Sequence, residues 1–177
     1  MIFINGSPRS GTTWLAKIFD SHPNVLYRHE PDIEQRNVDI PFLPREDEIE
    51  TYASAARAYV EQMRRIRTLR TSGTLPVFPK RYNSRLGCIV AIRVLEQIPG
   101  KKDWVRRLNI PDFLNGRGDD SVVTVIKSVG SLARMRLYLE AVPESKFILI
   151  IRHPCGFISS VLRGQETGNM ESSTPIG

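Results

Sequence analysis

The chain has 177 residues, of which 41% are hydrophobic and 25% charged, proportions typical of a globular domain with a real core. The sequence contains no apolar run of the roughly 18 residues that a membrane span requires. Its two cysteines form neither a CxxC pair nor a disulfide framework. We therefore expect a single domain over residues 1–177, without a membrane span, in a reducing compartment such as the cytoplasm.

The net charge of +6 is concentrated in the middle of the chain. Residues 57–107 carry 13 basic and 3 acidic side chains, whereas residues 1–56 carry 5 basic and 9 acidic ones. This basic block is compatible with an anionic partner or with a solvated helix face. Aromatic residues are not interleaved with the basic ones, as base stacking would require, so we expect no nucleic-acid partner.

A strand, a glycine-containing loop and a helix open the chain. Residues 1–5 predict a short buried strand, and the helix should begin near residue 11 and stop before Pro23. The residues expected on its apolar face are Trp14, Leu15, Ile18 and Phe19. A second short strand is expected at 25–27, followed by a loop over residues 31–45.

The central region predicts one long helix and then little regular structure. Helical spacing supports a helix from about residue 46 to 70. The apolar residues at that spacing are Tyr52, Ala56, Tyr59, Met63 and Ile66. Residues 71–86 are irregular, residues 87–98 are compatible with helix or strand, and residues 99–121 predict a short helix and a turn.

The last third of the chain alternates clearly between strand and helix. Residues 122–126 form a continuous β-branched run and residues 147–151 a continuous apolar run, both typical of strands buried on both faces. A helix after each strand is expected, the first ending at Pro143 and the second beginning at Pro154. The apolar residues expected on their buried faces are Leu132, Met135, Tyr138, Leu139 and Val142, then Ile158, Val161 and Leu162. This alternation predicts an α/β fold with a central parallel sheet and ligands at the carboxyl ends of its strands.

Residues 6–13, with the sequence GSPRSGTT, have the spacing of a phosphate-binding loop between a strand and a helix. In such a loop, glycines allow consecutive N–H groups to face an anion at the helix N-terminus. The lysine that usually follows the second glycine is replaced by Thr12, and Arg9 is the only cation of the loop. Without that lysine, this chain lacks one of the main sources of charge neutralisation that a phosphate-loop kinase uses. The motif nevertheless leaves a kinase open as an alternative.

Two motifs together resemble the sulfotransferases that use 3′-phosphoadenosine 5′-phosphosulfate. Residues 6–15 resemble the loop that binds the 5′-phosphosulfate, and residues 146–160 resemble the strand, loop and helix that bind the 3′-phosphate. The similarity covers residues 1–32 and 122–164. It implies a three-layer αβα fold of the phosphate-loop type. The donor-binding residues that it implies are Arg9, Ser10, Gly11, Thr12, Thr13, Trp14, Arg152 and Ser160.

The same resemblance implies three catalytic residues. In cytosolic members the base is a histidine two residues after a strand-end lysine, but here Lys127 is followed by Ser128 and Val129. Glu30 instead resembles the base of the tyrosylprotein, carbohydrate and bacterial branches, with His29 as an alternative base or an orienting residue. Lys127 and Arg9 would stabilise charge on the leaving phosphate.

Several expectations stay open at this stage. The family continues beyond the length seen here, so the resemblance implies a domain incomplete at its C-terminus. An active sulfotransferase, a non-catalytic binder of the donor or its product, and a kinase remain alternatives. The acceptor is expected to be a carbohydrate or another small molecule, and the basic block favours an anionic one. The three histidines and two cysteines have no metal-ligand spacing, so we expect no metal cofactor.

Overall fold

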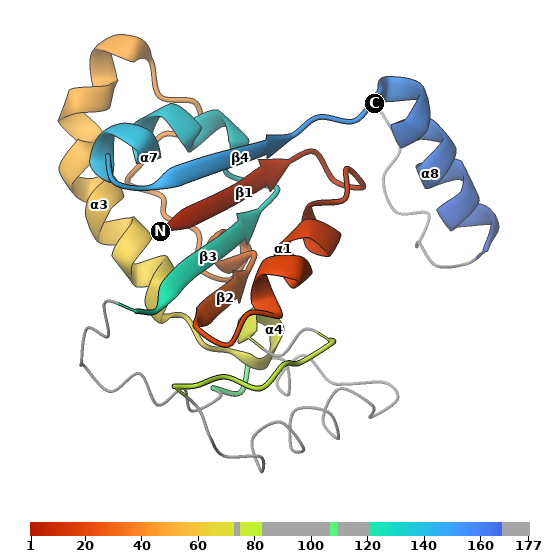
Figure 1. Ribbon diagram of the computed structural model, residues 1–177. Helices are drawn as coiled ribbons and strands as arrows, with labels where there is room; N and C mark the ends of the chain where they lie inside the picture. The colour runs from red at the N-terminus through yellow and green to blue at the C-terminus, as the bar shows by residue number, and fades with distance from the viewer. Residues whose placement is uncertain (73–74, 83–106, 110–120, 168–177) are drawn as a thin grey trace.

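The computed structural model describes residues 1–72, 75–82, 107–109 and 121–167. The interpretation of residues 87–98, and most of that of 99–121, lies outside these ranges. Four parallel strands form one sheet in the order β2-β3-β1-β4 (Figure 1). The strands are β1 (Ile2–Gly6), β2 (Val25–His29), β3 (Val123–Ser128) and β4 (Lys146–Ile150). The parallel sheet with its alternating helices confirms the predicted α/β class.

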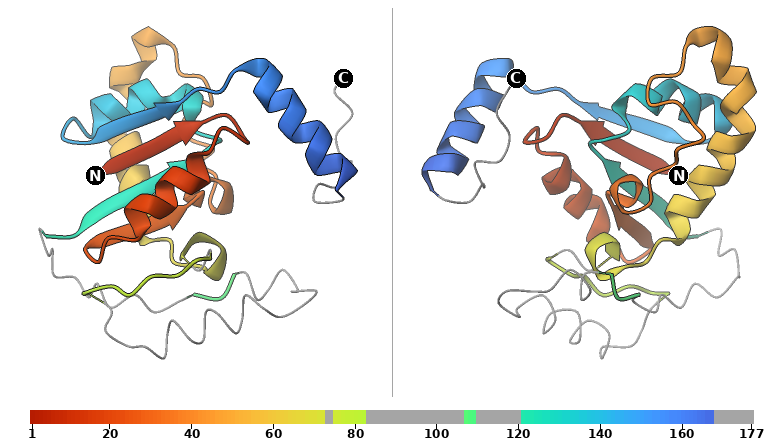
Figure 2. Two further views of the ribbon diagram at one scale, coloured as in Figure 1. Left: turned by 45° about the vertical axis from the view of Figure 1, so that its right-hand side comes forward. Right: turned by 180° about the vertical axis from the view of Figure 1, so that it is seen from behind.

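Helices cover both faces of the sheet. Side chains alternate between the two faces along each strand, so each face presents apolar residues that a helix layer buries. Phe3 packs with Tyr59 and Tyr138 in a core beneath α3 (Ile49–Arg65) and α7 (Met135–Ala141). Ile4 faces the other way and packs with Ala16 of α1 (Thr12–Asp20). Figures 1 and 2 show α1 on one side of the sheet and α3 with α7 on the other, which is a three-layer arrangement.

The long helix is shorter than the sequence predicts. A 3₁₀ turn (Glu46–Glu48) precedes α3, and a separate short helix α4 (Leu69–Ser72) follows it. The α3 helix ends at Arg65 because Ile66 takes extended backbone, and Arg28 Nε donates to the carbonyl oxygen of Arg64 at 2.8 Å. The predicted buried face is correct at Ala56, Tyr59, Met63 and Ile66. The region predicted as loop contains α2 (Pro31–Glu34).

Some predicted apolar faces are wrong. In α1, Trp14 is 72% exposed and Ile18 49%, whereas Ala16 is buried. In and just after α7, Tyr138 and Val142 are buried as predicted, but Leu139 is 40% exposed and Leu137 and Ala141 are buried instead. The sequence pattern identifies the apolar residues, but the direction in which each helix enters from its loop decides which of them face the sheet.

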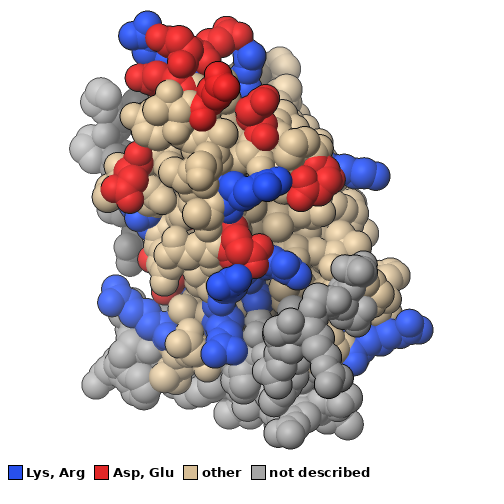
Figure 3. Space-filling model, turned by 90° about the vertical axis from the view of Figure 1, so that its left-hand side faces the viewer, with Lys and Arg blue, Asp and Glu red and all other residues tan. Residues whose placement is uncertain are grey.

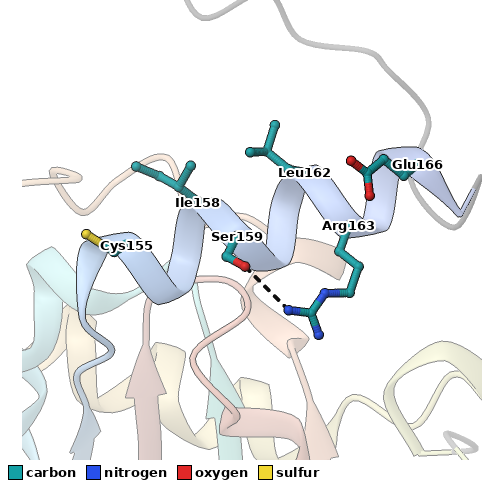
Figure 4. A pocket seen from close by; sticks show the side chains of 6 residues that line it. All are labelled: Cys155, Ile158, Ser159, Leu162, Arg163 and Glu166. Carbon is teal, nitrogen blue, oxygen red and sulfur yellow. Dashed lines mark hydrogen bonds between the residues drawn. The ribbon is translucent and has the colours of Figure 1, made fainter.

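β4 and the helix after it are also less buried than predicted. In this sheet β4 pairs with β1 and lies at the edge, so one side is not covered by another strand. Helix α8 (Pro154–Glu166) lies beside the sheet, beyond the end of β4, rather than on a face of it (Figures 1 and 2). Its residues Ile158 and Leu162 are each more than half exposed, and Figure 4 shows them on the side turned away from the sheet.

Charge is unevenly spread over the surface. Figure 3 shows acidic side chains gathered, together with a few Lys and Arg, at the end where the 3₁₀ turn and the start of α3 lie, and mainly Lys and Arg toward the other end. Within the described part of the basic block, Arg57 donates to the carbonyl oxygen of Ala141. Further contacts pair Arg64 and Arg65 with Glu61, Arg70 with Glu34, and Lys80 with Asp20. These contacts favour the interpretation of the block as structural and solvated charge.

Candidate active site

Each of the four strands carries one predicted site residue at or just after its carboxyl end. Glu30 follows β2, Lys127 is the second-last residue of β3, Arg9 lies in the loop after β1, and Arg152 comes two residues after β4. Because the strands are parallel and adjacent, all four residues belong to one edge of the sheet. In the spatial order of the strands they form the series Glu30, Lys127, Arg9 and Arg152.

The loop between β1 and α1 is tightly curled. Arg9 has a φ of 65° and Gly11 a φ of 96°, and left-handed residues of this kind turn backbone N–H groups toward a common centre. At Gly6, an added Cβ would lie 2.6 Å from the carbonyl oxygen of Ile150, so only glycine allows β4 and the loop to approach so closely. The hydroxyl of Ser10 is buried without a hydrogen-bond partner among the described residues. These features are those of a phosphate cradle.

The loop meets the second motif directly. Arg9 Nε donates to Ser160 Oγ at 3.1 Å, and Arg9 Nη2 donates to the carbonyl oxygen of Ser160 at 3.2 Å. Arg152 Nη1 donates to the carbonyl oxygen of Arg9 at 2.6 Å. Segments about 150 residues apart in the sequence therefore join at one place. These bonds bring together Arg9, Arg152 and Ser160, three of the residues that the resemblance implies for donor binding.

A cavity of about 400 Å³ opens at this cluster. Its lining residues are Arg9, Arg152, Ser160, Arg163, Gly164 and Thr167. Three of them are arginines and none is acidic, so the cavity suits an anion with more than one charge. Sequence reasoning missed Arg163 and Thr167. The signal was available, because they follow Ser160 by three and seven residues and so share its helix face.

The other predicted loop residues have different exposures. Thr12 is buried at the start of α1, Thr13 is exposed, and Trp14 presents its ring largely to solvent. His153 lies at the turn after Arg152 and caps α8, since its Nδ1 accepts a hydrogen bond from the amide of Cys155. A second hollow, of about 410 Å³, runs along another side of α8 (Figure 4), shares Arg163 with the first cavity, and includes none of the predicted site residues.

Glu30 and Lys127 form an ion pair at the other half of the edge. Lys127 Nζ donates to Glu30 Oε1, and the amide of Glu30 donates to the carbonyl oxygen of Lys127 at 2.8 Å. The two side chains are 15% and 4% exposed. Glu30 has a φ of 46°, a conformation that costs a non-glycine residue about 1–3 kcal/mol and is kept only where the surroundings fix it. Lys127 is the cation paired with Glu30, and within the described ranges no hydrogen bond or ion pair joins Glu30 to Arg9.

His29 lies against the second oxygen of Glu30. Its Nε2 is 3.8 Å from Glu30 Oε2, and its Nδ1 is 2.8 Å from the hydroxyl of Tyr27. Burial and, to a smaller extent, the positive charge of Lys127 together lower the pKa of His29 to about 4. Burial also raises the pKa of Tyr27 well above its usual value, so the phenol keeps its proton. At neutral pH both rings are therefore uncharged, with the phenol able to donate to His29.

The lowered pKa of His29 predicts a pH dependence of stability. The unfolded chain binds a proton on His29 below about pH 6.5, while the folded chain does so only below about pH 4. The free energy of unfolding should therefore fall as the pH drops from 6.5 to 4. Urea unfolding at several pH values should show a smaller fall in His29→Gln than in wild type. The exposed His22, replaced by glutamine, serves as control, and an identical slope in His29→Gln and wild type would contradict the assignment.

Where the chain is described, histidine, cysteine, aspartate and glutamate form no group of three that could hold a metal ion. Within the same ranges, no helix combines the length and the apolar character needed to cross a bilayer.

The chain belongs to the sulfotransferase family: a model of that family matches residues 2–174. The match includes the region of residues 33–121, where the sequence motifs gave no anchor. Searches of curated proteins and of solved structures found no significant match. The family assigns sulfuryl transfer as the general activity and agrees with the parallel sheet and its flanking helices.

Proposed function

We propose that this protein binds 3′-phosphoadenosine 5′-phosphosulfate and transfers its sulfuryl group to an acceptor hydroxyl, with Glu30 as the general base. The observation that carries the proposal is the order of the site residues along one sheet edge. Arginine residues follow β1 and β4, while the carboxylate and lysine pair ends β2 and β3. The donor then occupies the β1–β4 half, and the acceptor approaches from the β2–β3 half.

The residues of the loop and of α8 fit such a donor. The cavity with three arginines matches the charge of a nucleotide that has phosphate groups on two sides of its ribose. The orphaned hydroxyl of Ser10 and the amides around Gly11, Thr12 and Thr13 suit the phosphosulfate end, and Trp14 offers an exposed ring beside them. The donor supplies the activated sulfuryl group, and this chain's residues supply position and charge.

Donor binding must exchange contacts within the cluster. Arg9 and Ser160 bond to each other directly, although both are proposed to bind the donor. Their bonds are exposed to solvent, so replacing them with bonds to phosphate oxygens costs little and gains charge-assisted contacts. We infer that the donor separates Arg9 from Ser160 and takes the place of their bonds.

The chain's residues then divide the chemical work. The hydroxyl oxygen of the acceptor attacks sulfur in line with the departing phosphate oxygen. Glu30 accepts the proton of this hydroxyl during the attack. The sulfur–oxygen bond to phosphate breaks, and its electron pair stays on the phosphate. Arg9 and the loop amides stabilise that charge, assisted by Lys127 once its ammonium releases Glu30. His29 orients Glu30, because its Nδ1 is held by the hydroxyl of Tyr27 and its Nε2 lies 3.8 Å from Glu30 Oε2.

Transfer from a donor labelled in its sulfuryl group tests the proposal. We expect wild-type protein to label an acceptor from a panel of neutral sugars, acidic sugars, phenols and aliphatic alcohols. Acidic sugars are part of the panel because residues 57–107 carry 13 basic and 3 acidic side chains, although many of the described basic side chains are paired within the protein. Binding of the desulfated product without transfer to any acceptor class would instead support a non-catalytic binding module. Tighter binding of ATP with magnesium would support a kinase.

A further inference from the structure

A buried carboxylate on the segment that follows Glu30 takes no part in the proposed chemistry. Asp32 is 7% exposed and belongs to α2, two residues after Glu30. Within the described ranges it has no ion pair, although an ionised carboxylate is costly to bury without compensation. Its partners are hydroxyl groups: Ser128 Oγ donates to Asp32 Oδ2 at 2.6 Å, and Ser131 Oγ donates to the same oxygen at 2.7 Å.

These bonds join the two chain segments that carry the pair. Asp32 is on the turn that begins at Glu30, and Ser128 is the residue after Lys127. Ser128 Oγ also accepts the amides of Gly130 and Ser131 at 3.1 and 3.0 Å, so the turn after β3 folds around this hydroxyl. One carboxylate oxygen thus fixes the end of β3 to the start of α2.

The packing around Asp32 leaves little room for another arrangement. A Cβ added at Gly130 would lie 3.0 Å from Asp32 Oδ2, so the turn closes tightly over the carboxylate. Ser128 and Ser131 are 2% and 3% exposed, which excludes water as a ready substitute for their bonds. The strained φ of Glu30 also needs an external restraint, and the bond from its amide to the carbonyl of Lys127 is only one such restraint.

We propose that Asp32 is a positioning residue that, through Ser128 and Ser131, holds Glu30 and Lys127 in the geometry required for proton removal. This inference rests on the proposed function. The negative charge of Asp32 makes both hydroxyl bonds stronger than bonds between neutral groups would be. Asp32→Asn keeps the shape of the side chain but removes that charge, so the strand end and the turn should separate more often.

The test compares Asp32→Asn and Ser131→Ala with Glu34→Gln in the full chain. Glu34 is a matched control, because it lies on the same short helix and is nearly as buried, but faces Arg70 at 3.8 Å. For Asp32→Asn we expect kcat to fall by about 10²-fold, the cost of a misplacement near 1 Å, with KM for the donor almost unchanged. Ser131→Ala should have a smaller effect in the same direction, and Glu34→Gln should match wild type.

Amide hydrogen exchange provides a readout that does not depend on activity. In Asp32→Asn the amides of Glu30 and Ser131 should exchange at least about tenfold faster, while those of β1 keep their wild-type rates. A purely structural role would instead accelerate exchange throughout the sheet. Unchanged exchange at Glu30, or unchanged kcat in an active enzyme, would overturn the inference. A wild-type protein without transfer or donor-product binding would refute the proposed function, and the exchange rates would still decide whether Asp32 holds the pair.

Discussion

Replacement of Glu30 by glutamine should lower kcat for sulfuryl transfer by about 10²–10⁴-fold, the usual contribution of a general base. The amide cannot take the acceptor's proton, although it fills the same space between Lys127 and His29. Affinity for 3′,5′-bisphosphoadenosine should be nearly unchanged, since the donor is proposed to bind at the β1–β4 half of the edge. Steady-state kinetics together with calorimetry separate the two effects.

Two controls make the Glu30 result interpretable. Glu34→Gln removes a neighbouring carboxylate that pairs with Arg70, and it should leave kcat unchanged. His29→Gln should retain far more activity than Glu30→Gln if the ring only orients the carboxylate. If His29→Gln were the more damaged variant and Glu30→Gln kept wild-type turnover, histidine would be the base and Glu30 would lose its role.

Replacement of Arg152 by alanine should weaken binding of 3′,5′-bisphosphoadenosine by about 1.5–3 kcal/mol, or roughly 10- to 150-fold. The guanidinium lines the anionic cavity and also holds the carbonyl of Arg9, so both the ligand and the loop lose a contact. Titration calorimetry at fixed salt measures the change. Arg152→Lys keeps the charge without the planar fork, and its affinity should fall between those of the wild type and Arg152→Ala.

Arg136→Ala is the control for a general loss of positive charge. Its guanidinium pairs with the exposed Glu46 at 2.8 Å and is not among the residues that line the cavity. We expect wild-type affinity in this variant. Equal losses in Arg136→Ala and Arg152→Ala would indicate non-specific attraction of an anion and would contradict the assignment of Arg152.

The parts of this site that local sequence predicts are those encoded by short motifs. The glycines and Arg9 of the phosphate loop, and the spacing from Arg152 to Ser160, specify a strand, a turn and a helix without reference to the rest of the chain. The apolar strand runs similarly predict the parallel sheet. Because the strands are parallel, their carboxyl ends, and the site residues that follow them, lie at the same edge of the sheet.

Other features depend on tertiary pairing, which a local pattern does not contain. The register of β2 with β3 places His29 opposite Lys127 and thereby brings Glu30 to its ammonium. The network around Asp32 arises from the same pairing, and its residues have no distinctive spacing in the sequence. The exposure of Trp14 and Ile158 likewise depends on where α1 and α8 lie. The edge position of β4 is also set by tertiary pairing, because an apolar run alone does not distinguish a central strand from an edge strand.

Calorimetric titration of the folded, full-length wild-type chain with 3′,5′-bisphosphoadenosine tests the central claim most directly, because it needs no knowledge of the acceptor. The account predicts saturable binding at a single site, weakened by rising salt because arginine–phosphate contacts dominate it. It also predicts that adenosine 5′-monophosphate, which lacks the 3′-phosphate, binds much more weakly. Absence of binding heat at several temperatures, or equal affinity for the two nucleotides, would contradict the account.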